Sequence, residues 1–299
     1  MAEQASALGS AATPSRRRVE ALAALLHEPK VVGGGGFILF LVLAALLAPL
    51  ISPHDPLEQD LMSGALPPVG FAEAQAGFPI GTDDLGRDVL SRLIYGTRVA
   101  LTVAFVAASL AAVLGTALGL LAGYFGKLTD GVISRLIEIW MAFPPVLLSI
   151  LIVAIMGAGV ASVISAIAII DWTRFARVVR AETMAQAKAD YVTAARVIGF
   201  SRFTILLREI LPNIAPLLVA LLTLEMGIAV IVEAILSFVG LSVSSDTPTW
   251  GGMIAQGRQT IYQAWWVFAA PLAALFATVL AFNQLGDGLR RALDPAMRR

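Results

Sequence analysis

Cysteine is absent from this chain of 299 residues, and charged residues are scarce. Without a thiol there can be no disulfide, no thiolate metal site and no cysteine nucleophile. Asp, Glu, Lys and Arg fill 14% of the positions, against about 25% in an ordinary soluble domain. The formal net charge is zero, so no charge excess favours a nucleic-acid partner. What dominates is apolar: 58% of the residues, with a mean hydropathy of +0.82, which indicates an integral membrane protein.

Long uncharged runs predict where the chain crosses the membrane, since about 20 apolar residues span ~30 Å of hydrocarbon. These runs are residues 31–53, 99–126, 139–170, 213–238 and 259–286. The run at 139–170 is too long for one helix, and Gly157-Ala-Gly159 divides it, with Pro144-Pro145 kinking its first half. We therefore predict an all-α membrane protein with six transmembrane helices. Gly33 to Gly36 is expected to give the first helix a flexible start.

Basic residues predict the orientation of these spans. With the N-terminus inside, the inner segments are 1–36, 122–135, 172–212 and 287–299, and they hold 17 of the 21 Lys and Arg residues. Such a bias places both termini in the cytoplasm under the positive-inside rule. The predicted organisation is a tail at 1–30, a membrane domain at 31–286 and a second tail at 287–299. Within the membrane domain, 54–98 is an outer segment and 172–212 a cytoplasmic loop.

The loop carries an amphipathic basic unit at residues 190–212. We predict a helix, a turn at Gly199, a second helix capped by Ser201, and a stop at Pro212. Ala194 and Ala195 would let another protein approach closely. Apolar contact would come from Val197, Ile198, Phe203, Leu206 and Leu207. A docked soluble partner is one interpretation; the other is a helix lying on anionic lipid, anchored by Arg196, Arg202 and Arg208.

Several other polar and small residues can be interpreted from their positions, some of them in two ways. Glu225 and Glu233 are costly in hydrocarbon, so they either border a translocation cavity or form structural pairs between helices. Asp171 is expected to pair with Arg174. The acids at 83, 84 and 88 are expected in a solvated turn before a helix. Gly115, Gly119 and Gly123 recur every four residues and favour close helix packing over a gating hinge.

Several separated motifs resemble one known family. Thr193-Ala-Ala, then Gly199 and Leu211-Pro212, resembles the EAA loop of permease subunits of binding-protein-dependent ABC importers. Further matches are Gly81-Thr-Asp-Asp-Leu-Gly-Arg-Asp88, Ser91-Arg92, Phe143-Pro144, Leu236-Ser-Phe-Val-Gly-Leu241, Pro248-Thr-Trp-Gly251 and the segment 283–295. These are similar to the second permease of the dipeptide, oligopeptide and nickel branch. The family's glutamate is replaced here by Thr193, which removes a charge from that corner.

The resemblance implies a type I ABC importer permease that couples to ATPases through Thr193, Ala194, Ala195, Gly199, Leu211 and Pro212. Its partners would be a second homologous permease, two ATP-binding subunits and an extracytoplasmic substrate-binding protein, in an inner membrane. ATP and Mg would be bound by those ATPases, because the chain has no Gly-x-x-x-x-Gly-Lys-Ser/Thr loop and no cofactor, metal or catalytic site is expected. Dipeptides or oligopeptides are the first choice of substrate, with nickel or another small solute open. A self-sufficient secondary transporter is the alternative class, disfavoured by the docking helices and the lack of repeats.

Overall fold

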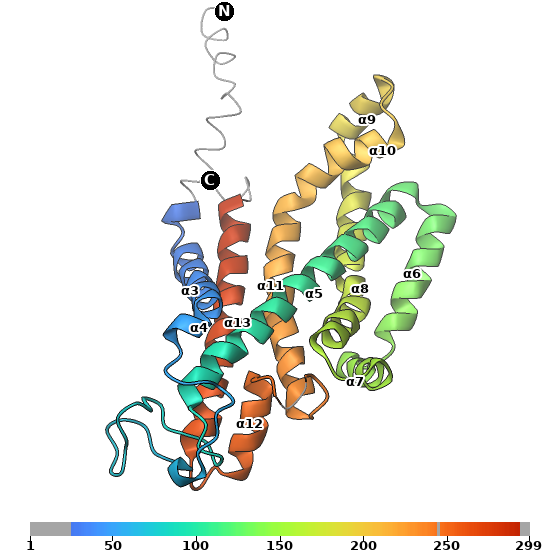
Figure 1. The fold of residues 1–299 in the computed structure, drawn as a ribbon. Helices are drawn as coiled ribbons and strands as arrows, with labels where there is room; N and C mark the ends of the chain where they lie inside the picture. The colour runs from blue at the N-terminus through green and yellow to red at the C-terminus, as the bar shows by residue number, and fades with distance from the viewer. Residues whose placement is uncertain (1–24, 244–245, 294–299) are drawn as a thin grey trace, which may run out of the picture.

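The computed structural model describes residues 25–243 and 246–293, and within them every regular element is a helix (Figure 1). One isolated bridge joins Thr82 to Asp88. The helices are α3 (Pro29–Leu46), α4 (Ala48–Ile51), η1 (Leu61–Ser63), α5 (Val89–Phe125), α6 (Lys127–Met141), α7 (Pro145–Met156), α8 (Val160–Gln186), α9 (Asp190–Val197), α10 (Arg202–Thr204), the π-helical η2 (Ile205–Ile210), α11 (Leu211–Phe238), α12 (Trp250–Gln259) and α13 (Trp265–Leu293).

The number of membrane-crossing helices is close to the prediction but differs in detail. Four helices are long and apolar enough to cross, or five if α6 and α7 form one broken span bent by 87°. The remaining predicted span corresponds to α8, where every stretch of 18 residues holds at least three charged side chains. Length therefore supports a sixth crossing, while composition alone does not.

Helix α5 is the central strut of the molecule, and it begins ten residues before the predicted run at 99–126. Its 37 residues extend about 55 Å, well beyond ~30 Å of hydrocarbon. The predicted glycine stripe is where α5 meets α8: a Cβ on Gly119 would lie 2.7 Å from the Ala176 carbonyl oxygen, and one on Gly123 2.7 Å from that of Arg180. The packing interpretation of these glycines is confirmed.

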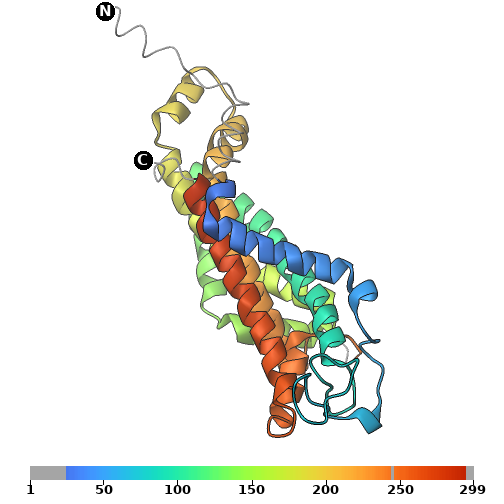
Figure 2. The ribbon, with the colours of Figure 1, turned by 90° about the vertical axis from the view of Figure 1, so that its left-hand side faces the viewer.

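Helix α3 crosses α13, as Figure 2 shows. Gly33 to Gly36 are helical here, so the expected flexible start is wrong. A Cβ on Gly34 would lie 2.6 Å from the Ala281 carbonyl oxygen, which explains why a small residue is needed. Lys30 pairs with Asp287 at 2.9 Å at the end of this contact.

Two predicted boundaries are corrected at the C-terminal end of the chain. Gln259 ends the separate helix α12, so the last span begins at Trp265 instead of residue 259. Helix α13 then runs on to Leu293, into the predicted tail at 287–299. Helical hydrogen bonding continues past the apolar run because Arg290 and Arg291 have high helix propensity and their charge is favourable in the last turn of a helix. The predicted tail at 1–30 lies mostly outside the described residues.

The two ends of the molecule differ in character. The start of α3, the end of α13 and the pair α9–α10 lie at one end (Figure 1), here called the α9 end. The segment 61–88 and α12 lie at the other, here called the opposite end. This arrangement groups the predicted cytoplasmic segments together and the predicted outer segments together.

Candidate functional site: the α9–α10 corner

The turn between α9 and α10 forms as a Schellman motif. Gly199 adopts φ +94°, a left-handed conformation that glycine accepts without strain. Its N–H donates to the Arg196 carbonyl at 3.1 Å, and the Phe200 N–H donates to the Ala195 carbonyl at 3.0 Å. The Ser201 hydroxyl then accepts from the Thr204 N–H at 3.2 Å and caps the next helix. The predicted helix–turn–helix, with its Gly199 break and Ser201 cap, is confirmed.

One face of this unit is buried against the protein itself. Its buried members are Val192, Ala195, Ile205, Leu206 and Ile210, which cluster with Leu120, Val179 and Ile214 of the long helices. Ala195 and Leu206 were expected on the contact surface for a partner, and for these two the structure gives a different role. Because they lie on the inward side of their helices, they attach the corner to α5, α8 and α11.

The other face is apolar and open. Val197 is 83% exposed, Ile198 73% and Phe203 62%. Thr193, Ala194 and Gly199 are also exposed, and nothing lies within 4 Å of where a Cβ on Gly199 would stand. Burying large apolar side chains is favourable by about 1.5–3 kcal/mol each, so an uncovered corner of this kind is suited to contact with another molecule.

Pro212 does not end the helix, contrary to the prediction. The helical path runs from Arg202 to Phe238 without interruption. The π-helical turn Ile205–Ile210 lies directly before the proline, and its wider i→i+5 pattern accommodates a residue that lacks an N–H. Leu211 is half-buried and Pro212 exposed at the start of α11. The corner is therefore joined rigidly to a membrane-crossing helix.

The two membrane acids are enclosed within the chain, with partners of their own. Glu225 is 3% exposed, and its carboxylate lies 3.3 Å from Nη1 of Arg174. Arg174 also pairs with Asp171 at 3.7 Å, as expected. Glu233 is 1% exposed and accepts hydrogen bonds from the Ser237 hydroxyl at 2.6 Å and the Ser242 hydroxyl at 3.1 Å. Both arrangements fit the structural reading, and whether either acid borders a cavity stays a prediction.

A buried polar cluster at the opposite end was not predicted from the sequence. Asp83 is fully buried and forms ion pairs with Arg87, at 2.8 Å, and with Arg92. The Gln256 side chain of α12 accepts from both arginines, at 2.9 and 3.0 Å, and donates to Asp84. The expectation of a solvated turn is thus wrong for Asp83, because Arg87 of the same loop and Arg92 of helix α5 enclose it.

Asp88, also expected in that turn, is 1% exposed and caps α5 through the Ser91 N–H at 2.9 Å. A helix does start here, as predicted. The pairing of Asp83 with Arg87 could have been predicted, since the two are four residues apart. The contact with Gln256 could not, because this residue is too distant in the sequence for any local pattern to indicate it.

No group of three or more metal-ligating side chains occurs among the described residues. The histidine ring of His54 stacks on Phe78 with centroids 4.5 Å apart.

The chain matches two protein-family models. The model of the binding-protein-dependent transport system inner membrane component matches residues 115–299. The model of the N-terminal TM domain of oligopeptide transport permease C matches residues 19–68.

Three relatives are similar over almost their whole length. The di/tripeptide transport system permease protein DppC of Pseudomonas aeruginosa is 40% identical, over 91% of this chain and 90% of that protein. The dipeptide transport system permease protein DppC of Haemophilus influenzae is 39% identical, over 88% and 89%. The glutathione transport system permease protein GsiD of Pectobacterium atrosepticum is 38% identical, over 91% and 89%.

The fold is also found in a solved structure. An inward-facing form of the MetNI methionine ABC transporter contains a chain that superposes with a TM-score of 0.57 at 22% identity. The match covers 68% of this chain and 96% of the other. This confirms the type I importer permease fold predicted from the sequence.

Proposed function

Because this chain belongs to the family of binding-protein-dependent transport system inner membrane components, we propose that it is one of two permease subunits of an ATP-driven peptide importer. The observation that carries the proposal is the exposed apolar corner Val197–Gly199, held on a rigid base. A partner that covers this corner would bury its apolar side chains, which is favourable. An ATPase subunit with a matching cleft is the partner that the family provides.

The corner acts as a lever. Its buried face is attached to α5 and α8, and its second half continues into α11 without a break. A partner that pushes on Ile198 or Phe203 therefore moves three long helices together instead of deforming a loop. ATP and Mg belong to the partner subunits, and this chain converts their closure into an alternation between inward-facing and outward-facing states.

Short peptides are the proposed substrate. The relatives at 38–40% identity carry dipeptide, di/tripeptide and glutathione transport in their names, and all of these solutes contain peptide bonds. An extracytoplasmic binding protein delivers the peptide, and a second homologous permease completes the pathway. Nickel or another small solute remains the alternative cargo. Both termini and the α9 end face the cytoplasm in this proposal.

The test compares two substitutions at Gly199. Any residue other than glycine is strained at φ +94°, at a cost of about 1–2 kcal/mol. Gly199→Ala carries this strain with a single methyl group, and Gly199→Trp adds an indole for which this chain has open space. We expect the tryptophan variant, far more than the alanine control, to lose assembly with the ATPases or to hydrolyse ATP without uptake.

The measurements are peptide uptake and ATPase activity of the reconstituted complex, per assembled complex. If Gly199→Trp transports as well as Gly199→Ala, the corner does not dock into an ATPase and the coupling assignment fails. Loss of uptake for peptides but not for nickel salts, or the reverse, identifies the cargo in the same experiment.

A further inference from the structure

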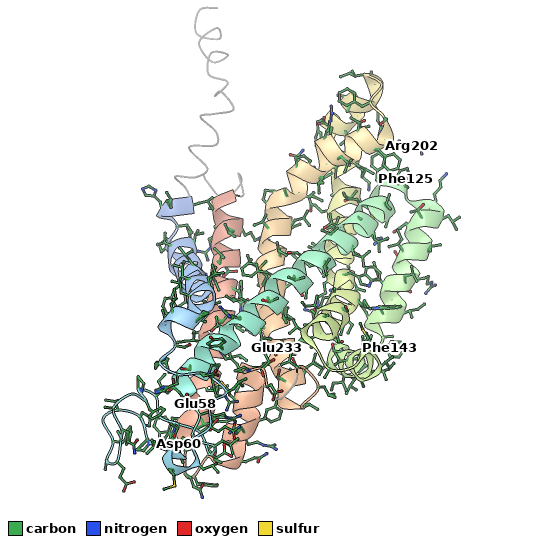
Figure 3. The ribbon with its side chains drawn as sticks, viewed as in Figure 1. Glu58, Asp60, Phe125, Phe143, Arg202 and Glu233 are labelled. Carbon is green, nitrogen blue, oxygen red and sulfur yellow. The ribbon has the colours of Figure 1, made fainter. Side chains whose placement is uncertain are left out.

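A polar cavity lies where the end of α5 meets the α9–α10 corner. Its volume is about 610 Å³, and its lining residues are Tyr124, Phe125, Lys127, Arg196, Phe200, Arg202 and Ile205. Figure 3 shows Phe125 and Arg202 beside each other at this junction. The cavity is separate from the exposed docking face, because Val197 and Ile198 do not line it. The same short unit therefore presents a second surface.

Three cationic side chains line this cavity: Lys127, Arg196 and Arg202. None of the three forms an ion pair with an acid in the described part of the chain. Instead, the Arg196 guanidinium lies 5.3 Å from the centroid of the Tyr124 ring, and that of Arg202 lies 6.0 Å from the Phe125 ring. Three uncompensated positive charges around one cavity are suited to an anion, and the aromatic faces hold the guanidinium groups in place.

An apolar groove lies along the same face of α5, nearer the middle of the helix. Its volume is about 390 Å³, and it is lined by Ala112, Val113, Thr116, Ala117, Leu120, Leu207, Leu211, Leu218, Val219 and Leu222. On α5 the lining positions 113, 117, 120 and 124 recur every three or four residues, so groove and cavity share one helix face. Val113 is 71% exposed and Leu207 58%, so the groove is open along its side.

The depth of the two spaces matches the layers of a bilayer. Phe125 is the last residue of the apolar helix α5, and Lys127 follows it at the start of α6. Aromatic rings and basic side chains at the end of a span lie at the level of the lipid headgroups. The groove is lined by positions 112–120 of the same helix, and so lies in the hydrocarbon layer.

We propose that this cavity and groove form one binding site for an anionic phospholipid, with the phosphate among Lys127, Arg196 and Arg202 and an acyl chain against Ala117 and Leu120. The corner then has two faces with two ligands: its apolar tip contacts a protein, and its basic side holds a lipid. A bound lipid ties the corner to the end of α5, so its occupancy affects how firmly the lever is held. The site itself is proposed from the structure alone. Only the assignment of the bound lipid to the cytoplasmic leaflet of the membrane depends on the proposed topology.

The test measures lipid retention by the purified complex. The complex is extracted from nanodiscs containing phosphatidylcholine and phosphatidylglycerol, and retained lipid is counted by native mass spectrometry. Each basic residue near a membrane surface contributes about a fivefold factor in affinity. We therefore expect Arg196→Gln with Arg202→Gln to lower phosphatidylglycerol affinity roughly 25-fold, leaving phosphatidylcholine unaffected.

Two controls separate the site from general basicity. Arg208→Gln removes an exposed charge six residues beyond Arg202, outside the cavity, and should retain the lipid. The double variant Arg196→Lys with Arg202→Lys keeps both charges and should retain most of the binding, which excludes a loss caused by misfolding. Equal losses for Arg208→Gln and the cavity variants would overturn the proposal.

The groove is tested independently of the charges. Ala117→Trp fills it with an indole, whereas Leu114→Trp places the same ring on an exposed position of α5 that does not line it. We expect only Ala117→Trp to weaken phosphatidylglycerol retention.

A competition experiment distinguishes a lipid from a soluble anion. If glycerol 3-phosphate displaces the lipid as readily as phosphatidylglycerol itself does, the site belongs to a soluble anion. Unchanged retention in Ala117→Trp would equally exclude the acyl chain from the groove. Either result contradicts the lipid assignment without affecting the importer function.

Discussion

The Glu233 side chain is held in position by its hydrogen-bond partners. Its carboxylate accepts from Ser237, one turn further along α11, and from Ser242 in the following segment. Both hydroxyls are buried with it. The carboxylate thus stabilises the turn after α11, a role that needs an acceptor at this position more than it needs a charge.

We predict that Glu233→Gln leaves peptide uptake per assembled complex within about a factor of two of the parent, because the amide oxygen can accept from both serines. Glu233→Leu should instead lower complex stability, since each buried hydroxyl left without a partner costs about 1–3 kcal/mol. Uptake must be normalised to the amount of assembled complex. A Glu233→Gln complex that assembles fully but transports one peptide class differently would show that the acid borders the translocation cavity.

At the residue scale the sequence predicted types of environment, and it predicted a partner only where the two residues are close along the chain, as for Asp171 and Arg174. The cost of charge in hydrocarbon sufficed to predict that Glu225 and Glu233 avoid lipid. The pairing of Glu225 with Arg174 joins positions 51 apart, and no local pattern encodes it. Asp83 was misjudged for the same reason. Its acidic, glycine-containing surroundings are typical of an exposed turn, while Arg92 and Gln256, which bury it, come from two other elements.

At the element scale, the contact of α5 with α8 rests on glycines. We predict that Gly119→Val lowers the thermal unfolding midpoint of the purified complex, because the added Cβ would lie 2.7 Å from the Ala176 carbonyl oxygen and 2.8 Å from Val179 Cβ. Overpacking of this kind costs about 1–3 kcal/mol. Gly131→Val on α6 is the matched control, since nothing lies within 4 Å of its Cβ position. Equal midpoints for the two variants would mean that α5 and α8 separate easily.

Helix positions could be predicted from hydrophobic runs, whereas helix ends could not. Apolar runs show which residues contact lipid, but helices continue into water as long as backbone hydrogen bonds are satisfied, so α5 begins early and α13 ends late. The Pro144-Pro145 kink was predicted from the missing N–H groups and appears as the break between α6 and α7. The π-helical turn before Pro212 has no compositional signal and was missed.

For the whole molecule, the arrangement of helices is consistent with the orientation that we propose from the distribution of charge. The α9 end gathers the start of α3, the end of α13 and the α9–α10 corner, which carry Lys30, Arg290, Arg291, Arg196 and Arg202 (Figure 1). The opposite end gathers segment 61–88 and α12, where Arg87 and Arg92 both form an ion pair with Asp83. Lys and Arg are therefore concentrated at the α9 end, the end that the positive-inside rule predicts to face the cytoplasm.

This orientation can be tested with single cysteines, since the chain contains none of its own. We predict that Gln75→Cys, exposed at the opposite end, reacts with a membrane-impermeant maleimide in intact spheroplasts. Lys188→Cys, exposed just before α9, and a cysteine appended after Arg299 should react only after the membrane is opened. Peptide uptake by each variant serves as the control for native assembly. Labelling of residue 188 from outside would show that the molecule has the opposite orientation, with the apolar corner on the side away from any cytoplasmic ATPase. That result would contradict both the charge argument and the proposed coupling.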